Sequence, residues 1–175
     1  LNADTLEPRP DTETVVEAVL AAIPDRKANL KLIDFGTGTG CILLALLSEL
    51  PNATGVGVDL SPLAVEAAAG NAERNGLADR ARFQTGDWAK GIGDRFDIVV
   101  SNPPYIPSAD IATLEPEVRE HDPLRALDGG PDGLEPYRIL AAELPRLLVP
   151  GGLAAFEVGQ GQAEDVAALV EAQGL

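Results

Sequence analysis

Residues 30–40 read Leu-Lys-Leu-Ile-Asp-Phe-Gly-Thr-Gly-Thr-Gly, and this stretch decides the fold. Leu30 to Phe35 form a short apolar run that predicts a strand, and the apolar run from Cys41 to about Leu50 predicts a helix. Between them, three glycines allow backbone N–H groups to approach a ligand without interference from a Cβ atom. The stretch therefore predicts a strand, a ligand-binding loop and a helix in succession, although a tight turn without a ligand would need the same glycines.

The alternation of short apolar runs with helical patterns continues along the chain. Further strands are predicted at 54–59, 81–84, 96–101 and 153–158, and further helices at 12–23, 62–76, 134–148 and 161–173. Asp11 or Thr12 is the expected N-cap of the first helix, and Pro150-Gly151-Gly152 is expected to turn the chain into the last strand. Residues 106–132, which are rich in Pro and acids, are expected to be irregular. This order predicts an α/β fold with a parallel sheet, in which ligands bind beyond the carboxyl ends of the strands.

Composition narrows the classes of function. The 175 residues are enough for one domain with a proper core, and 28 Asp and Glu against 13 Lys and Arg give a net charge of -15. Such a chain lacks the basic stripe that supplies most of the affinity for nucleic acid, so no direct nucleic-acid partner is expected. One Cys and one His make neither a disulfide nor a zinc site, and no metal is expected. Without a signal peptide or an apolar run of about 20 residues, the expected location is the cytoplasm, with no membrane partner.

The glycine loop could hold several kinds of ligand. A P-loop would end in Gly-Lys-Ser or Gly-Lys-Thr, and no Lys is present here. A dinucleotide site would have glycines at its first, third and sixth positions, but the sixth position is Cys41. The run Asp34 to Gly40 instead resembles the signature loop of S-adenosylmethionine-dependent methyltransferases. The loop residues expected to hold that cofactor are Gly36, Thr37, Gly38, Thr39 and Gly40.

Acidic residues follow the next two predicted strands. Asp59 ends the second strand, where a carboxylate can accept hydrogen bonds from both hydroxyls of a ribose. NAD enzymes use an acid at the same place, and Asp59 could instead cap the helix beginning at Pro62, a role that Ser61 could also fill. Asp87 is expected to accept from the adenine amino group, with Trp88, the only Trp, as an apolar wall, although a buried Trp is more often core.

Asn102-Pro103-Pro104-Tyr105 directly follows the strand predicted at 96–101, which is nearly all apolar. The two prolines fix the backbone and cannot donate, which leaves the carbonyl of Pro103 and the side-chain oxygen of Asn102 as acceptors. Two fixed acceptors can hold both N–H groups of an amide or aromatic NH2 group and expose the nitrogen lone pair to a methyl donor. Tyr105 would pack on the flat face of the planar group. The turn therefore predicts an amine or amide acceptor, although a Pro-rich loop after a strand can also be purely structural.

Together these residues resemble the PrmC/HemK family, the glutamine methyltransferases of peptide chain release factors. The likeness includes Pro8-Arg9-Pro10-Asp11-Thr12-Glu13, which matches the motif leading into the catalytic domain, and a run from Glu117-Val118 to Tyr137-Arg138 that matches the substrate-side loop. Pro150-Gly151-Gly152 and Glu157-Val158-Gly159 with Gln162 match the last strand and its exit. Glu7, where an apolar residue is common, and His121 in a polar loop, where Tyr is common, depart from the pattern and affect only the detail of docking.

The resemblance implies a Rossmann-like class I S-adenosylmethionine-dependent methyltransferase with a parallel-rich sheet flanked by helices, truncated here at both ends. Residues 1–25 are expected to be a linker and first helix and 26–175 the methyltransferase domain, with the family's N-terminal helical domain and last strands absent. The implied activity is methylation of N5 of the glutamine in the Gly-Gly-Gln motif of release factors, with S-adenosylhomocysteine as the product. Alternatives are an adenine N6-type nucleic-acid methyltransferase, a glutamine methyltransferase of a ribosomal protein and a binding module without catalysis.

Overall fold

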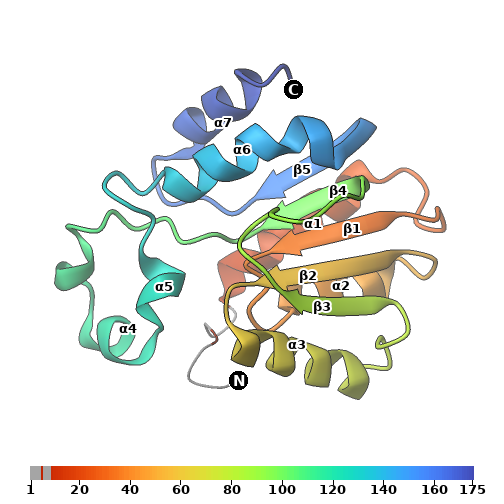
Figure 1. Cartoon of the computed structure of the whole chain (residues 1–175), viewed down its shortest axis with the longest axis horizontal. Helices are drawn as coiled ribbons and strands as arrows, with labels where there is room; N and C mark the ends of the chain where they lie inside the picture. The colour runs from red at the N-terminus through yellow and green to blue at the C-terminus, as the bar shows by residue number, and fades with distance from the viewer. Residues whose placement is uncertain (1–4, 6–8) are drawn as a thin grey trace.

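The computed structural model describes residue 5 and residues 9–175, which form a layered α/β structure around one sheet (Figure 1). The five strands are β1 (Lys31–Phe35), β2 (Thr54–Asp59), β3 (Ala81–Thr85), β4 (Phe96–Ser101) and β5 (Leu148–Phe156). They lie in the order β3-β2-β1-β4-β5, and every neighbouring pair is parallel. The predicted parallel α/β sheet is therefore confirmed.

Helices cover both faces of this sheet. The long ones are α1 (Glu13–Ala22), α2 (Cys41–Glu49), α3 (Pro62–Arg74), α6 (Glu135–Leu147) and α7 (Ala163–Glu171). One core cluster joins side chains of α1, α2 and α3 to Leu32 of β1, and the other joins α6 and α7 to Ile33 and Phe35. Because successive side chains of a strand point to opposite faces, β1 contributes side chains to both cores, which explains its almost continuous apolar run.

The chain changes direction across the sheet between β1 and β4. From β1 it proceeds outward through β2 to β3 and then returns to place β4 on the other side of β1. The loops that follow β1 and β4 therefore leave the sheet in different directions and open a space at the carboxyl ends of these two strands. The loop residues singled out from the sequence follow β1, β2, β3 and β4, so the topology brings them to this edge.

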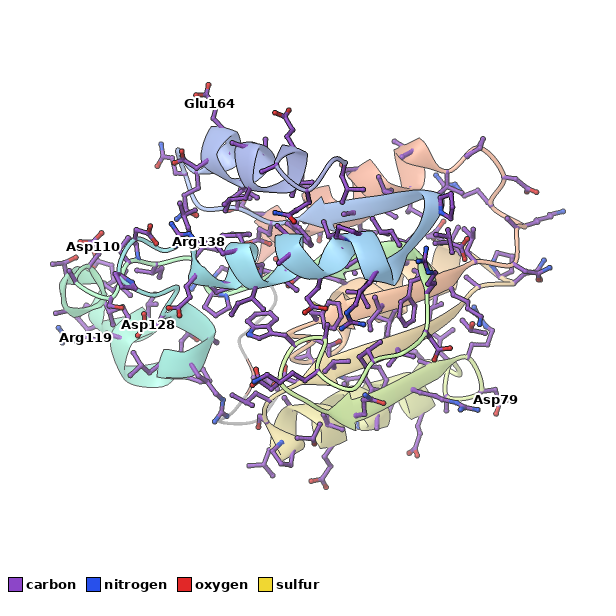
Figure 2. All side chains as sticks on the ribbon, turned by 45° about the horizontal axis from the view of Figure 1, so that its top comes forward. Asp79, Asp110, Arg119, Asp128, Arg138 and Glu164 are labelled. Atoms are coloured by element: carbon purple, nitrogen blue, oxygen red, sulfur yellow. The ribbon has the colours of Figure 1, made fainter. Side chains whose placement is uncertain are left out.

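Residues 106–132 are more regular than predicted. They contain a 3₁₀ turn (Ile111–Thr113) and two short helices, α4 (Pro116–His121) and α5 (Leu124–Leu127). These elements form a lobe beyond the carboxyl ends of the strands (Figure 1), with Asp110 and Arg119 at its outer side (Figure 2). The expectation of an irregular segment, with His121 in a loop, was wrong because helices of four to six residues are too short to show a helical period.

The last strand begins earlier than the sequence indicated. α6 ends at Leu147, and β5 starts at Leu148 and includes Pro150-Gly151-Gly152, with a register shift against β4 between Phe96 and Ile98. The predicted strand at 153–158 is confirmed over 153–156, but its start was placed too late because a proline and two glycines are typical of a turn. β5 is an edge strand of this sheet, where a missing N–H and an irregular pairing are tolerated.

The start of the first helix also differs from the prediction. A 3₁₀ turn (Pro10–Thr12) precedes α1, and Thr12 occupies the N-cap position without a hydrogen bond from its side chain to the helix. Its hydroxyl instead donates a hydrogen bond to the carboxylate of Glu157. Ser61, by contrast, caps α3 by accepting from the N–H of Ala64 at 3.3 Å. The predicted linker over residues 1–8, with Glu7 and Pro8, lies outside the described residues apart from Thr5. In the described part of the chain, no helix combines the length and apolarity needed to cross a membrane.

Candidate functional site

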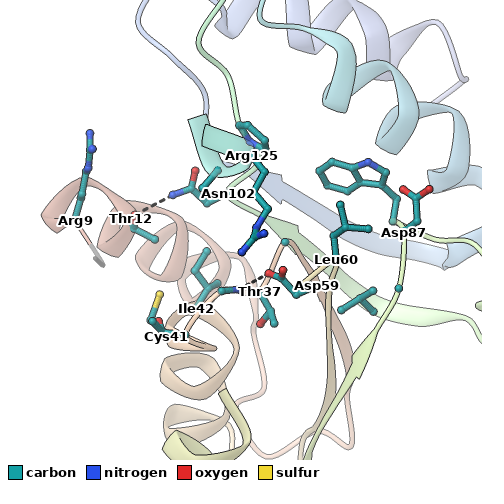
Figure 3. A pocket seen from close by; sticks show the side chains of 18 residues that line it. Arg9, Thr12, Thr37, Cys41, Ile42, Asp59, Leu60, Asp87, Asn102 and Arg125 are labelled. Atoms are coloured by element: carbon teal, nitrogen blue, oxygen red, sulfur yellow. Dashed lines mark hydrogen bonds between the residues drawn. The ribbon is translucent and has the colours of Figure 1, made fainter. Parts of the chain in front are cut away.

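A cleft lies at the carboxyl ends of β1, β2 and β4 (Figure 3). Half of its 18 lining residues were predicted as site residues from the sequence: Gly36, Thr37, Gly38, Thr39, Asp59, Asp87, Trp88, Asn102 and Pro104. The other half were not: Arg9, Thr12, Cys41, Ile42, Val58, Leu60, Gly86, Arg125 and Ala126. Three predicted residues, Gly40, Pro103 and Tyr105, are not among the lining residues. The structure thus collects loops that are far apart in the sequence around one space.

The glycine loop after β1 is fixed to the end of β2. The carbonyl of Val58 accepts hydrogen bonds from the N–H groups of Gly36 and Thr37, at 2.9 and 3.1 Å. Gly36 and Gly38 have φ angles of +66° and +54°, and a Cβ atom on either would meet nothing closer than 3.9 Å. The positive φ angles favour glycine at both positions, and a side chain at either one would occupy the open space that the backbone faces. We call this space the cradle. This arrangement fits a ligand that lies directly against the backbone.

Gly40 has a different role from the other two glycines. A Cβ atom there would lie 3.2 Å from the side chains of Ala68 and Phe83, and its φ is +78°. The absence of a side chain therefore allows the start of α2 to pack closely on α3 and β3. Because the same packing would be needed with or without a ligand, Gly40 supports the shape of the loop rather than its contact surface.

Asp59 sits at the point where the glycine loop and α3 meet. One carboxylate oxygen accepts from the N–H of Gly38 at 2.8 Å, and the other accepts from the N–H of Ser61 at 2.9 Å. Each oxygen of a carboxylate has a further lone pair, so both can also accept from a pair of adjacent hydroxyls. Since Ser61 caps α3, Asp59 is not needed as the cap, and its carboxylate is both held in place and exposed to the cleft.

A turn after β3 closes the cleft on the other side. Asp87 and Trp88 both line it, with Leu60 from the end of β2 as a further apolar surface. Among the described residues, Trp88 is the only one other than glycine with a positive φ, at +50°. Such a backbone is unfavourable for a bulky residue and is tolerated where the surroundings fix it, often at a functional site. Asp87 pairs with Lys90 at 2.5 Å through one oxygen, which leaves the other to face a donor.

The Asn102-Pro103-Pro104-Tyr105 turn is anchored on both sides. Ser101, at the end of β4, donates its hydroxyl to the carbonyl of Phe35 at 2.7 Å and accepts from the N–H of Glu157 at 3.0 Å. The side-chain N–H of Asn102 donates to the hydroxyl of Thr12 at 3.2 Å (Figure 3). A Cβ atom on Gly36 would lie 3.9 Å from the carbonyl oxygen of Asn102, so the turn adjoins the glycine loop.

Tyr105 connects this turn to the lobe. Its carbonyl accepts from the side chain of Gln162 at 3.0 Å, and a Cβ atom on Gly129 would lie 2.8 Å from its Cα atom. Only a glycine fits at Gly129, so the lobe is held tightly against the end of the turn. Burial raises the pKa of the Tyr105 hydroxyl, and the carboxylate of Glu157 raises it further. Tyr105 therefore remains a neutral ring beside the turn.

Asp34 is the most perturbed acid in the site. It is 1% exposed, accepts from the hydroxyl of Thr37 at 2.7 Å through one oxygen, and has no partner for the other among the described residues. Burial raises its pKa to about 7, the bond from Thr37 lowers it, and the negative charge of Asp59 raises it. The end of β1 thus holds a carboxyl group that gains its charge near neutral pH and responds to a positive charge placed nearby.

Arg9 and Thr12 were not predicted as site residues, although both lie in the motif Pro8-Arg9-Pro10-Asp11-Thr12-Glu13 that was recognised in the sequence. Arg9 forms an ion pair with Asp122 at 3.2 Å, which joins the segment before α1 to the turn between α4 and α5. Thr12 lines the cleft and bonds to both Asn102 and Glu157. The motif at 8–13 and the run at 117–138, which contains Asp122, both resemble the same family, and this was the signal that they meet in space. No group of three or more His, Cys, Asp or Glu suited to a metal ion occurs in the described ranges.

Comparison with known families decides the class of protein. Residues 26–171 match the profile of a family described as "Methyltransferase domain". This chain belongs to that methyltransferase family. The matched range contains all five strands and, apart from Arg9 and Thr12, every residue that lines the cleft, so most of the cleft lies within the matched methyltransferase domain.

Relatives and solved structures agree with this assignment. This chain is 61% identical over 175 residues to a "Release factor glutamine methyltransferase" of Rhodospirillum rubrum, and the match covers all of this chain and 53% of that protein. Its structure is similar to a ribosomal protein L11 methylase from Lactobacillus delbrueckii subsp. bulgaricus, with a TM-score of 0.67, 18% identity and coverage of 94% and 69%.

An RNA methyltransferase from Salinibacter ruber, in complex with S-adenosyl-L-homocysteine, is also similar, with a TM-score of 0.58, 22% identity and coverage of 91% and 82%. At these identities the two structures establish the fold of the methyltransferase domain, which is the predicted Rossmann-like class I fold. The chain spans about half of the length of the curated relative from Rhodospirillum rubrum.

The buried Asp34 should make stability depend on pH in a specific direction. Its folded pKa of about 7 lies above the ordinary 3.8, so the stabilisation from its protonated form is fully present below about pH 4 and is lost as the pH rises through 7. Asp34→Asn removes this titration. We therefore expect the unfolding temperature of the variant, relative to the native protein, to be higher at pH 8 than at pH 5 by calorimetry. A difference that is the same at both pH values would contradict the raised pKa.

Proposed function

We propose that the protein transfers a methyl group from S-adenosylmethionine to the side-chain N5 of the glutamine in the Gly-Gly-Gln motif of peptide chain release factors. The observation that supports the acceptor most directly is the Asn102–Tyr105 turn beside the glycine loop. The Cβ position of Gly36 and the carbonyl oxygen of Asn102 are 3.9 Å apart, so a group held by the turn lies next to a ligand held by the loop.

The residues of the turn suit an amide acceptor. In an amide, the nitrogen lone pair is delocalised into the carbonyl and is a poor nucleophile. We infer that the side-chain oxygen of Asn102 and the carbonyl of Pro103 accept the two N–H groups and favour a tetrahedral nitrogen, which frees the lone pair. Tyr105 supports the flat face of the amide, and Pro104 lines the cleft next to it. Pro103 is buried and Asn102 is bonded to Thr12, so both acceptors have fixed positions.

The reaction is an in-line displacement. S-adenosylmethionine, when bound, supplies a methyl group on a positively charged sulfur. The amide nitrogen forms a bond to the methyl carbon as the bond from carbon to sulfur breaks, and the nitrogen then releases one proton to solvent. Since the proton leaves after the methyl group arrives, the chain needs no strong base, and positioning supplies most of the rate.

The cofactor roles proposed for the cleft follow from its donors and acceptors. Gly36, Thr37, Gly38, Thr39 and Gly40 form the loop that lies along the cofactor, with Gly40 acting through packing. Asp59 accepts from the ribose hydroxyls through the lone pairs that its bonds to Gly38 and Ser61 leave over. Asp87 accepts from the adenine amino group, and Trp88 provides an apolar wall. Membership of a methyltransferase family supports this assignment.

A protein substrate is favoured over nucleic acid for two reasons. The net charge of -15 opposes binding to a phosphate backbone, and the relative with 61% identity carries the name of a release factor glutamine methyltransferase. The lobe at 106–132 adjoins the acceptor turn through Tyr105, which suits it to contact the protein substrate. The proposal also includes residues 26–175 as the methyltransferase domain, reached through residues 1–25, and a location in the cytoplasm, where release factors act.

Methyl transfer can be measured directly by mass spectrometry. The substrates are purified release factor, the same factor with the Gly-Gly-Gln glutamine replaced by alanine, a ribosomal protein mixture and duplex DNA. We expect one added methyl group on the intact factor alone, because the proposed acceptor is the glutamine of the Gly-Gly-Gln motif and not glutamine in general. Methyl groups on DNA or on ribosomal protein would replace the proposed substrate by one of these two classes. Cofactor binding without transfer to any substrate would indicate a binding module.

Asn102→Ala removes one of the two acceptors proposed to hold the amide. We expect turnover to fall by about 10²-fold or more, as for other losses of a key positioning hydrogen bond. The affinity for S-adenosylhomocysteine, measured by calorimetry, should change little. Asn52→Ala is the matched control, because Asn52 is exposed in a turn and its side chain bonds only to the carbonyl of Lys27 among the described residues. Equal turnover in both variants would remove Asn102 from the acceptor site.

Asp59→Asn replaces one acceptor oxygen of the carboxylate by a donor and keeps the shape of the side chain. We expect weaker binding of S-adenosylhomocysteine, by about tenfold for the loss of one hydrogen bond of roughly 1.5 kcal/mol to a charged group. Asp97→Asn is the matched control, because Asp97 accepts from the N–H of Lys31 at the opposite end of the sheet. Calorimetry should show a change in affinity at Asp59 only, and the same affinity in both variants would contradict the ribose role.

A further inference from the structure

A chain of hydrogen bonds connects Glu157, Thr12 and Asn102. The hydroxyl of Thr12 donates to a carboxylate oxygen of Glu157 at 2.7 Å, over a separation of 145 residues. The side-chain N–H of Asn102 donates to the same hydroxyl at 3.2 Å, over a separation of 90 residues. The three residues come from the segment before α1, the end of β5 and the end of β4. We call them the Glu157–Thr12–Asn102 relay.

The relay has only one consistent direction. A carboxylate accepts hydrogen bonds and has no hydrogen of its own to donate, so the single hydrogen of the Thr12 hydroxyl must go to Glu157. The hydroxyl oxygen then has only lone pairs to offer, and of the two ends of the Asn102 amide only the nitrogen can donate to it. The carboxylate of Glu157 therefore determines, through Thr12, which way the amide of Asn102 faces.

The consequence concerns the oxygen of Asn102. With the nitrogen bonded to Thr12, the oxygen points away from Thr12 (Figure 3), and Asn102 itself lines the cleft. The opposite orientation would place the two N–H groups of Asn102 where the substrate also presents N–H groups. No hydrogen bond could form there, because both groups are donors and neither offers an acceptor. An amide in the wrong orientation would thus repel the acceptor amide instead of holding it.

We propose that Thr12 and Glu157 are positioning residues that fix the Asn102 amide with its oxygen toward the acceptor. This inference rests on the proposed function for what the oxygen holds, but the orientation itself depends only on the relay. Neither Thr12 nor Glu157 needs to touch the reacting atoms. Their effect reaches the reaction through the side chain of Asn102.

Glu157 is well placed to act as the fixed end of the relay. Its N–H donates to the carbonyl of Ser101 at 3.0 Å, and its carbonyl accepts from the hydroxyl of Tyr137 at 2.8 Å. Tyr137 is fully buried, so these bonds hold the backbone of Glu157 against the end of β4. The relay therefore starts from an acid whose backbone is tied to the same strand end from which Asn102 extends.

Thr12→Val tests the relay because it replaces the hydroxyl by a methyl group of similar size. Thr12→Ser is the conservative counterpart, since it keeps the hydroxyl and loses only a methyl group. We expect Thr12→Val to lower kcat by about tenfold or more, as the amide of Asn102 loses its fixed orientation, with little change in the affinity for S-adenosylhomocysteine. Thr12→Ser should restore most of kcat. Thr14→Val is the matched control, because Thr14 is exposed on α1 and bonds to the carbonyl of Asp11.

The orientation of the amide can also be observed without turnover. In a ¹⁵N-labelled protein, the side-chain NH2 signals of Asn102, assigned by their loss in Asn102→Asp, should show magnetisation transfer to the methyl group of Thr12. The hydrogen bond should also slow exchange of these protons with water. In Thr12→Val we expect faster exchange, and in Thr12→Ser exchange close to native. Equal exchange in the native protein and Thr12→Val would overturn the relay, whatever the activity.

The two measurements separate this inference from the proposed function. If the native protein methylates the release factor and Thr12→Val has native kcat, the inference is wrong and the proposed function stands. If the native protein methylates no release factor but the exchange of the Asn102 protons depends on the Thr12 hydroxyl, the proposed function is wrong and the relay stands. A fall in kcat that Thr12→Ser does not restore would assign Thr12 a structural role in place of the positioning role.

Discussion

The end of β2 holds the loop that follows β1, and the rest of the cleft depends on this attachment. Val58 offers one carbonyl to two successive N–H groups of the loop, and the next residue, Asp59, offers its carboxylate to a third. These bonds turn the loop across the strand ends and leave the faces of Gly36 and Gly38 open. Without them, the glycines would have many conformations and the cradle would form only when a ligand imposed it.

The side of the cleft formed by the turn after β4 is fixed by different means. Prolines limit the backbone of the turn after β4, and the bonds of Ser101 tie its start to β1 and β5. Its far end is held by Gln162, which bonds to the carbonyl of Tyr105, and by the close approach of Gly129. The cleft therefore joins a loop shaped by glycines to a turn shaped by prolines. The loop leaves its backbone open to the cleft, and the turn gives its carbonyl and amide groups fixed positions.

The sequence predicted those parts of the structure whose cause is local. The succession of strands and helices along the chain, the loop after β1 and the turn after β4 follow from apolar runs and from Gly and Pro, which act within a few residues. The start of β5 was missed because Pro150 and Gly151 resemble a turn locally, and only the edge position makes them acceptable in a strand. Thr12 was interpreted as a helix cap because its real partners lie 90 and 145 residues away. Contacts of that range leave no periodic signal in a single sequence.

The separation of Thr12 from Glu157 also has a consequence for the order of folding. Contacts between residues far apart in the chain form late, because the entropy of closing a long loop must be overcome first. The glycine loop and its attachment to β2 need only residues 36 to 59 and can form early, both in refolding and during synthesis. The relay needs residue 157, so in a growing chain the glycine loop can form long before the side chain of Asn102 is oriented. The two sides of the cleft are therefore completed at different times.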